Sequence, residues 1–288
     1  MPVSDTARSD PAGLDPAGFD PARYGPWAVI AGGSEGVGAS FALQLADAGV
    51  DLVLIARKPG PLEETAEAVR ARGVRAVTLS VDLTESSAID EIIAATADLD
   101  VGLLVYNAGA NSYGSEFVTG DLDGFRTVID LNITAQLALV HHFGRRLRDR
   151  GRGGLLLVGS MSGYLGGTHL SVYGGVKAFG RVFAESLWLE LRDHGVDVLE
   201  LVLGVTRTPA MERAGLNLGA AMGVSEPDDV AREGLEHLAD GPVWIAGGNA
   251  ARAEKINGPD RRKLILRQHE AMSKLFPRRG EHDAVAIP

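Results

Sequence analysis

Short, nearly continuous apolar runs recur along the chain from Trp27 onward, and each is followed by a stretch with helical spacing. Runs of this kind, such as residues 155–158 and 198–203, are typical of strands that are buried on both faces of a parallel sheet. We expect strands at residues 27–31, 51–56, 74–80, 101–106, 154–159 and 196–203, with a further short apolar segment at 243–246.

The stretches between these runs repeat their apolar residues at helical spacing. Helices are expected at residues 37–48, 61–72, 85–97, 123–149, 171–194 and 226–239, and a last one at about 260–276. Strands that alternate with helices imply repeated strand–helix–strand units with right-handed crossovers. The pattern therefore predicts an α/β fold: a Rossmann-like, doubly wound, mostly parallel seven-stranded sheet with helices on both faces.

The beginning of the chain has a different pattern, with Asp-Pro-Ala recurring every five residues from Asp10. Prolines at this density prevent a helix and remove donors that a sheet would need. We expect residues 1–22 to form a flexible, Pro-rich N-terminal arm, and we favour a solvated leader over an arm that clasps a partner subunit. No linker-like stretch follows, so residues 23–288 are expected to form a single domain.

Composition narrows the functional classes. The chain has 288 residues, of which 45% are hydrophobic, enough for one sizeable core. Its net charge of −10 argues against a nucleic-acid partner, and the lack of cysteine excludes disulfides and thiolate chemistry. Neither a signal peptide nor an apolar run long enough for a membrane span is present, so we expect a soluble cytoplasmic protein.

The first strand runs into a glycine-rich turn, Gly32-Gly-Ser-Glu-Gly-Val-Gly38, that opens the next helix. Glycines allow a tight turn and a close backbone approach, and a helix N-terminus attracts a pyrophosphate. The spacing differs from the common G-x-G-x-x-G fingerprint. A plain strand–helix turn is the alternative, but three glycines at the first junction favour cofactor binding.

The residue after the second strand bears on the choice of cofactor. An acidic residue about 20 positions beyond the glycines would bind the ribose hydroxyls of NAD, whereas arginine accommodates the 2′-phosphate of NADP. Arg57 stands there, which favours NADP(H) over NAD(H), although Glu35 within the turn adds no positive charge. Asp82, after the third strand, would either accept a hydrogen bond from adenine or cap the following helix.

Tyr173 and Lys177 are four residues apart in a segment predicted to be helical, so they would stand one turn apart on one face. A nearby ammonium favours the phenolate and moves the pKa of tyrosine from about 10 toward the range useful at neutral pH. Such a pair also occurs by chance on solvated helices. Its weight therefore depends on the rest of the chain.

These features together resemble the short-chain dehydrogenase/reductase family over about residues 27–250. Residues 31–38 look like its cofactor turn, with Ala31 where threonine is usual. Residues 106–109 look like its Asn-Asn-Ala-Gly element, with Tyr106 in place of the first asparagine.

The resemblance extends to a catalytic tetrad. Asn132 matches the helix asparagine of the family, and Ser160 lies 13 residues before Tyr173, at the usual serine position. Ser162 is an alternative, but its spacing to the tyrosine fits less well. The resemblance implies that Tyr173 is the general acid or base and that Ser160 donates a hydrogen bond to the substrate oxygen.

The same resemblance implies that Lys177 lowers the pKa of the tyrosine and binds the nicotinamide ribose, while Asn132 holds a water that links Lys177 to solvent. It also shows one departure, because Leu203-Gly204 replaces the Pro-Gly motif of the family. The implied cofactor-binding residues are Gly32, Ser34, Glu35, Gly36, Val37, Gly38, Arg57, Asp82, Leu83, Asn107, Ala108, Gly109, Tyr173, Lys177, Gly204, Thr206 and Thr208.

The resemblance thus implies a dinucleotide-binding catalytic domain: an NADP(H)-dependent oxidoreductase that interconverts a carbonyl and a secondary alcohol. An apolar substrate, steroid-, acyl- or ketone-like, is expected because residues 205–225, the predicted substrate lid, are rich in methionine and leucine. Residues 23–28 also loosely resemble members that act on steroids and fatty acyl chains. The alternatives are a non-catalytic NADP-sensing or scaffold protein on the same fold and an NAD-linked dehydrogenase.

Helices 123–149 and 171–194 look apolar on more than one face, so a homodimer or homotetramer is expected, as in this family. No metal site is expected, because the adjacent His141 and His142 face different directions on a helix. His169 would line the substrate pocket or belong to a surface loop, of which we favour the loop.

Overall fold

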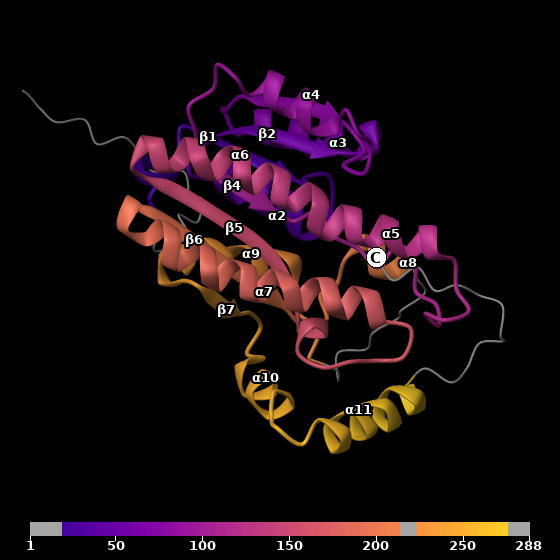
Figure 1. Cartoon of the computed structure of the whole chain (residues 1–288). Helices are drawn as coiled ribbons and strands as arrows, with labels where there is room; N and C mark the ends of the chain where they lie inside the picture. Colours follow the sequence, from indigo (N-terminus) through magenta and orange to yellow (C-terminus); the bar gives the residue numbers. More distant parts are fainter. Residues whose placement is uncertain (1–18, 214–222, 276–288) are drawn as a thin grey trace, which may run out of the picture.

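A computed structural model describes residues 19–213 and 223–275 of the chain. One seven-stranded sheet organises it, and every pair of neighbouring strands is parallel (Figure 1). In spatial order, the strands are β3 (Ala76–Ser80), β2 (Asp51–Ala56), β1 (Trp27–Ala31), β4 (Val101–Tyr106), β5 (Gly153–Ser160), β6 (Val196–Leu203) and β7 (Val243–Ile245). The predicted doubly wound fold is confirmed, with most strand bounds within two residues.

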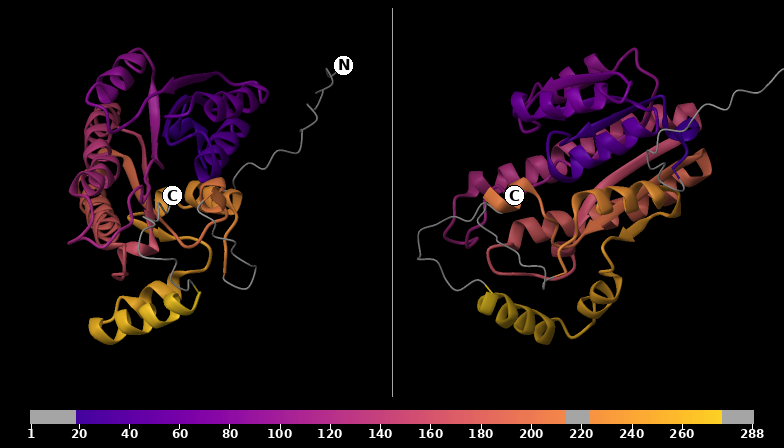
Figure 2. Two further views of the ribbon diagram at one scale, coloured as in Figure 1. Left: turned by 90° about the vertical axis from the view of Figure 1, so that its right-hand side faces the viewer. Right: turned by 180° about the vertical axis from the view of Figure 1, so that it is seen from behind.

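Helices cover both faces of this sheet, as the edge-on view in Figure 2 (left) shows. One face carries α2 (Gly36–Asp47), α3 (Pro59–Arg70) and α9 (Pro227–Glu236), and the other carries α4 (Ala88–Ala95), α5 (Leu122–Ile129), α6 (Ala135–Arg150) and α7 (Ser171–Leu191). Successive strand residues point to opposite faces, so strands with apolar residues at every position are explained by burial on both sides.

The strand order reverses between β1 and β4, and ligands of doubly wound folds bind at this switch point. The turns after these two strands touch there. A Cβ atom on Gly32 would lie 2.8 Å from the backbone nitrogen of Ala108, and Gly32 has a φ of +84°. Only glycine satisfies both the left-handed conformation and the close approach.

The predicted helix over residues 123–149 is interrupted. A π-helical turn, Asp130–Thr134, separates α5 from α6 and contains Asn132. Three helices were missing from the sequence prediction, α1 (Pro21–Tyr24), α8 (Pro209–Arg213) and α10 (Ala250–Ile256). Short 3₁₀ turns also occur at Met161–Gly163, Arg192–His194 and Leu238–Asp240.

The predicted N-terminal arm is shorter than expected at its C-terminal end. Residues 19–22, which were assigned to that arm, belong to the fold: Phe19 is buried and stacks on Tyr24 with 5.2 Å between the ring centroids. The Asp20 carboxylate accepts a hydrogen bond of 2.9 Å from the backbone nitrogen of Ala22 and caps α1 (Pro21–Tyr24). Proline is compatible with the first turn of a helix, which explains the error. Residues 1–18 lie outside the described part.

The C-terminal helices α10 and α11 (Arg261–Leu275) lie beyond β7, below the sheet in Figure 1. Two polar contacts connect α11 to the loop that precedes α7: the Arg261 guanidinium donates to the carbonyl of Tyr164 at 2.7 Å, and Thr168 Oγ1 lies 3.1 Å from His269 Nδ1. Among the described helices, none is long and apolar enough to cross a membrane.

Candidate active site

The four residues of the predicted tetrad come from three neighbouring elements. Ser160 is the last residue of β5, Tyr173 and Lys177 lie in the first two turns of α7, and Asn132 lies in the π-helical turn before α6. Helix α7 packs along β5 and β6, as Figure 1 shows. The fold therefore gathers residues that are far apart in sequence at the carboxyl ends of the central strands.

The hydroxyl of Ser160 accepts a hydrogen bond of 3.1 Å from the backbone nitrogen of Ser162, and its side chain is near enough to Tyr173 to influence the phenol. Of the two serines, Ser160 is the one that acts on the tyrosine. Burial raises the pKa of the Tyr173 phenol above its ordinary value, and the side chain of Ser160 opposes this rise.

Lys177 was expected to lower the pKa of Tyr173, whereas in this structure burial raises that pKa and the opposing influence comes from Ser160. The ammonium nitrogen lies 5.8 Å from the centroid of the Tyr173 ring and donates a hydrogen bond of 3.1 Å to the carbonyl of Val158. Burial lowers the pKa of Lys177 to about 8, while the nearby Glu200 carboxylate raises it. The lysine is therefore close to the tyrosine, and its charge depends on its surroundings.

Asn132 is held by two hydrogen bonds from its side-chain nitrogen, 3.0 Å to the carbonyl of Ala110 and 2.9 Å to that of Val128. Its oxygen Oδ1 is buried and has no partner among the described residues. Single π-helical turns inside α-helices are frequent at functional sites. The turn here fixes an amide whose oxygen is left for a further partner.

Gly109 keeps the space beside that oxygen open. A Cβ atom on residue 109 would lie 2.8 Å from Asn132 Oδ1 and 2.8 Å from Lys177 Nζ. An acceptor and a donor therefore converge on one small polar space, the kind of site at which buried water is found.

Tyr106 is a residue whose contact the sequence did not reveal. Its buried hydroxyl donates a hydrogen bond of 2.6 Å to the carbonyl of Leu131, next to Asn132, and burial raises its pKa. The phenol therefore ties the end of β4 to the π-helical turn. The only signal in the sequence was that a tyrosine stands where the family has asparagine.

The glycine turn lies where the sequence placed it. Gly36 has a φ of +55°, and a Cβ atom on it would lie 3.0 Å from Cγ2 of Thr208. The carbonyl of Ser34 accepts a hydrogen bond of 3.0 Å from Thr65, and Val37 is buried. The turn is thus fixed from α3 on one side and approached by the segment after β6 on the other.

Glu35 forms an ion pair with Arg213 of α8, and one of its two hydrogen bonds is 2.9 Å long. The hydrogen bond from Arg213 lowers the pKa of Glu35, and partial burial opposes that effect. The negative charge that counted against NADP in the sequence is therefore balanced by a cation that the sequence did not point to.

Arg57 is exposed over 64% of its side chain, and its guanidinium lies 3.7 Å from the carboxylate of Asp82. Asp82 accepts hydrogen bonds from the backbone nitrogen and the hydroxyl of Thr84, at 3.0 Å and 2.8 Å. Burial alone would raise the pKa of Asp82, but these bonds and Arg57 lower it overall. Since α4 begins only at Ala88, Asp82 closes a local turn and does not cap that helix.

The remaining predicted cofactor residues lie on the neighbouring turns. Asn107 donates a hydrogen bond of 2.9 Å from its side chain to the carbonyl of Gly32, so it joins the turns after β1 and β4. Leu83 is buried. A Cβ atom on Gly204 would lie 2.6 Å from Asn249 Nδ2, which shows that Asn249 packs against the turn that lacks the family proline.

Two threonines follow that turn. Thr206 is buried and forms an isolated bridge with Ser225, and Thr208 accepts a hydrogen bond of 3.3 Å from the nitrogen of Met211. The predicted lid over residues 205–225 is described only in part, because residues 214–222 lie outside the described residues. His169 lies in the loop before α7 with a φ of +62°.

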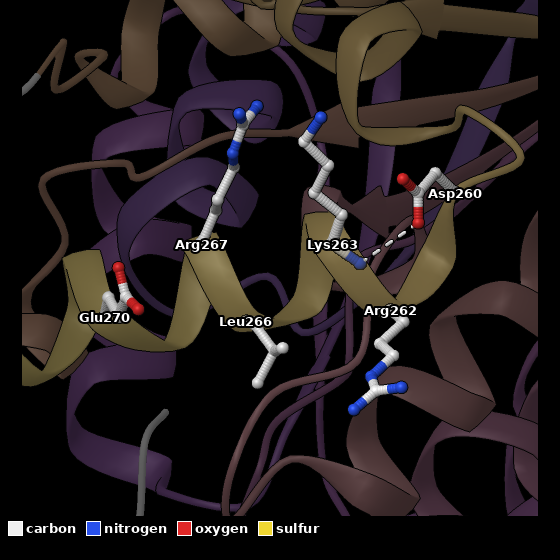
Figure 3. A pocket seen from close by; sticks show the side chains of 6 residues that line it. All are labelled: Asp260, Arg262, Lys263, Leu266, Arg267 and Glu270. Carbon is white, nitrogen blue, oxygen red and sulfur yellow. Dashed lines mark hydrogen bonds between the residues drawn. The ribbon is translucent and has the colours of Figure 1, made fainter.

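A separate hollow lies on the surface of α11, and Figure 3 shows its lining. Arg267 and Lys263 extend to one side of the helix, and Leu266 and Arg262 to the other. The backbone nitrogen of Lys263 donates a hydrogen bond of 3.3 Å to Asp260. The lining comes from α11 and the residue before it, and none of the predicted catalytic residues takes part. The lining residues are Asp260, Arg262, Lys263, Leu266, Arg267 and Glu270.

Comparisons with known proteins agree with this geometry. The family model described as short chain dehydrogenase matches residues 26–218. A 7beta-hydroxysteroid dehydrogenase of Clostridium sardiniense is 31% identical over 255 residues, which cover 88% of this chain and 96% of the relative. A very-long-chain 3-oxoacyl-CoA reductase of Neurospora crassa is 34% identical over 194 residues, which cover 66% of this chain and 58% of the relative.

Solved structures are similar over most of the chain. A structure from a study of 7beta-hydroxysteroid dehydrogenase stereoselectivity aligns with a TM-score of 0.81 and 28% identity, covering 86% of this chain and 98% of that chain. A short-chain dehydrogenase from Sphingobium yanoikuyae in complex with NADPH aligns with a TM-score of 0.72 and 30% identity, covering 90% of this chain and 98% of the other.

Proposed function

The chain belongs to the short-chain dehydrogenase family and is an oxidoreductase that acts on CH–OH groups, and from this premise we propose that it uses NADP(H) to interconvert a ketone and a secondary alcohol on an apolar small molecule. The observation that carries the proposal is the position of Ser160 at the end of β5, close to Tyr173 of α7, with Lys177 one turn further along that helix.

Each residue of the tetrad has a role in this proposal. The Tyr173 hydroxyl gives its proton to the carbonyl oxygen in reduction and takes it back in oxidation, while the Ser160 hydroxyl stabilises the negative charge on that oxygen. Lys177 holds the nicotinamide ribose and supplies a positive charge. Asn132 holds a water in the space beside Gly109, through which the proton of the tyrosine is replaced.

The nucleotide residues fit a dinucleotide. Gly32 and Gly36 leave room at the N-terminus of α2, where the backbone amides attract a pyrophosphate. The bound cofactor would supply the hydride, and the protein supplies position and electrostatics. The exposed guanidinium of Arg57 favours NADP(H), because it can bind a 2′-phosphate, and the ion pair with Arg213 neutralises the Glu35 carboxylate that would repel this group.

Two similarities support the substrate class. The relatives that the comparisons name act on a hydroxysteroid and on a very-long-chain 3-oxoacyl thioester, and both substrates present a ketone or secondary alcohol on an apolar body. We propose the same chemical class here, with the segment after β6 and helix α11 forming the side of the site that receives the apolar body.

The test is a panel of steroid ketones, 3-oxoacyl thioesters and small polar ketones with NADPH and NADH, measured for wild type and Tyr173→Phe. We expect bulky apolar ketones to be reduced, and the variant to lose at least about 100-fold in kcat while NADPH binding persists. No turnover of any carbonyl by a wild type that binds NADPH would support the sensor or scaffold alternative. A clear preference for small polar ketones would contradict the substrate class.

We also propose a homo-oligomer in which α7 contributes to the interface. Phe179, Val182 and Leu189 are exposed on this helix, over 36%, 55% and 64%, and lie three or seven residues apart on one side. Multi-angle light scattering should give a dimer or tetramer for wild type and smaller species for Val182→Asp. A monomeric wild type at micromolar concentration would overturn this proposal.

A further inference from the structure

Glu200 interrupts an apolar row on the face of β6 that packs under α7. Val196 and Val198, at alternate positions of this strand, lie in the apolar cluster of that face, so an apolar residue is expected next in the row. A glutamate stands there instead, paired in register with Leu157 of β5, and only 2% of it is exposed. A buried carboxyl group in such a row is costly unless it has a partner.

Two glycines provide the space for this side chain. A Cβ atom on Gly159 of β5 would lie 2.6 Å from Cδ of Glu200, and one on Gly180 of α7 would lie 3.3 Å from its Oε1. The oxygen Oε2 is buried and has no hydrogen-bond partner among the described residues. Strand and helix are therefore both shaped around a carboxyl group that no hydrogen bond within the described structure explains.

The charged groups around this carboxyl all come from α7: Lys177 and Arg181 attract it, and Glu185 repels it. Its neighbours in the sheet, β5 and β7, contain no ionisable side chain. Lys177 donates its hydrogen bond to the carbonyl of Val158, the residue before Gly159. The carboxyl group of Glu200 thus lies beside the end of β5, which accepts the hydrogen bond from Lys177.

We propose that Glu200 is a positioning residue for Lys177, whose ammonium group it keeps charged and directed toward the end of β5, where Tyr173 and Ser160 meet. The proposal rests on the proposed function, since it matters only if Lys177 serves proton transfer and ribose binding. Within the described residues, Glu200 forms no hydrogen bond with Ser160 or Tyr173, and it acts through Lys177.

The electrostatics give this role a direction. Burial raises the pKa of Glu200 to about 8, and Lys177 and Arg181 oppose the rise while Glu185 adds to it. Burial also lowers the pKa of Lys177 to about 8, and Glu200 opposes that fall. As the pH rises, ionisation of Glu200 places a negative charge beside Lys177 and helps it to retain its proton. The two groups titrate as a coupled pair.

Lysine NMR tests this directly. The chain has five lysines, so the ε-methylene signal of Lys177 can be resolved in protein labelled with ¹³C-lysine and assigned with Lys177→Arg. In Glu200→Gln we expect the titration midpoint of Lys177 to fall by about one pH unit, since an opposite charge nearby has been removed. Glu190→Gln, which removes an exposed carboxylate from α7, the helix of Lys177, should leave the Lys177 midpoint unchanged.

The pH profile of ketone reduction is the second readout. The basic limb of kcat should move to lower pH in Glu200→Gln and stay in place in Glu190→Gln, while Glu200→Asp restores part of the wild-type profile. A purely structural role would lower activity equally at every pH. If Glu200→Gln does not fold, Glu200→Asp should still show a smaller fall in the Lys177 midpoint, because its carboxyl group is one methylene shorter.

The outcomes separate the two proposals. An unchanged Lys177 midpoint in a folded Glu200→Gln or Glu200→Asp variant, with wild type active on ketones, overturns the role of Glu200 and leaves the proposed function intact. A wild type that binds NADPH and reduces no ketone overturns the proposed function whatever the midpoint does. If the Lys177 midpoint shifts but the pH profile of kcat does not, Glu200 affects only the charge of Lys177, and its role in the reaction is overturned.

Discussion

The two faces of the sheet differ in how they treat buried polar groups. On the face of α2, α3 and α9, the buried hydroxyls of Ser40 and Thr65 are hydrogen-bonded, to Asp228 at 2.6 Å and to the carbonyl of Ser34 at 3.0 Å. On the face of α4 to α7, buried polar atoms of Asn132 and Glu200 have no partner among the described residues.

The comparison shows that the two faces differ in their unpartnered polar groups. Buried polar groups without a partner are rare in folded proteins, because each costs desolvation free energy. All the buried side-chain atoms of this kind in the described residues lie outside α2, α3 and α9. They belong to Asn111, Asn132, Gln136, His142 and Glu200. The helices of one face therefore contain no buried side-chain atom of this kind among the described residues, whereas the other face retains several, among them Oδ1 of Asn132 in the candidate site.

A pair of core substitutions gives the largest expected difference between the faces. Leu45 of α2 is fully buried in the apolar face, and Leu45→Ala should lower the free energy of unfolding by about 2–5 kcal/mol. Gln136 of α6 is buried with an unpartnered oxygen, so Gln136→Met should leave stability unchanged or raise it. Urea unfolding of both variants measures the difference. A large loss in Gln136→Met would show that its amide has a structural partner.

The space beside Gly109 gives the next largest effect. Gly109→Ala would place a methyl group between Asn132 Oδ1 and Lys177 Nζ, so we expect kcat to fall about 100-fold. Gly60→Ala, at a position with nothing nearby and on the opposite face, is the matched control and should keep full activity. Steady-state kinetics with thermal melts separate the effect from unfolding. Unchanged turnover in Gly109→Ala would mean that this space has no role in the reaction.

The sequence predicted the fold closely because its signals are local. Apolar runs located the strands, and glycines located the turn after β1. The π-helical turn was not predictable, because residues 123–149 have a continuous helical pattern and the interruption depends on contacts with β4. The helical start at residues 21–24 was missed for a different reason, since prolines in the first turn of a helix resemble those of an extended arm.

The candidate site was predicted in its residue types and not in its electrostatics. The tetrad was expected from the family resemblance, and the structure places its four residues on neighbouring elements. Glu200 influences the pKa of Lys177 because β6 packs against α7. The sequence pattern does not show which residues come together through such packing. The ion pair between Glu35 and Arg213 was missed for the same reason.

The next prediction concerns the choice between NADPH and NADH, which we assign to Arg57 after β2. Removing the guanidinium in Arg57→Ala should weaken NADPH binding about tenfold and leave NADH binding unchanged, because only NADPH carries the 2′-phosphate. Arg192→Ala, an exposed arginine after α7, is the control. Fluorescence titration of each variant with both cofactors measures the effect. Equal affinity of wild type and Arg57→Ala for NADPH would favour an NAD-linked dehydrogenase.

The smallest effects are expected from removing the hydroxyls of two buried tyrosines at opposite ends of the sheet. Tyr106 donates a hydrogen bond of 2.6 Å to Leu131 beside Asn132, and Tyr24 donates one of 2.7 Å to Asp197, remote from the tetrad. Either hydroxyl should contribute about 1 kcal/mol to stability. Tyr106→Phe should also reduce kcat several-fold, because the π-helical turn loses the contact that fixes it.

Tyr24→Phe should lose a similar amount of stability with kcat unchanged. Thermal unfolding and steady-state kinetics on the same preparations give both quantities for each variant. If the two substitutions affect kcat equally, the hydroxyl of Tyr106 supports the fold in general and not the placement of Asn132. A fall in kcat confined to Tyr106→Phe would instead show that the contact between β4 and the π-helical turn sets the geometry of the candidate site.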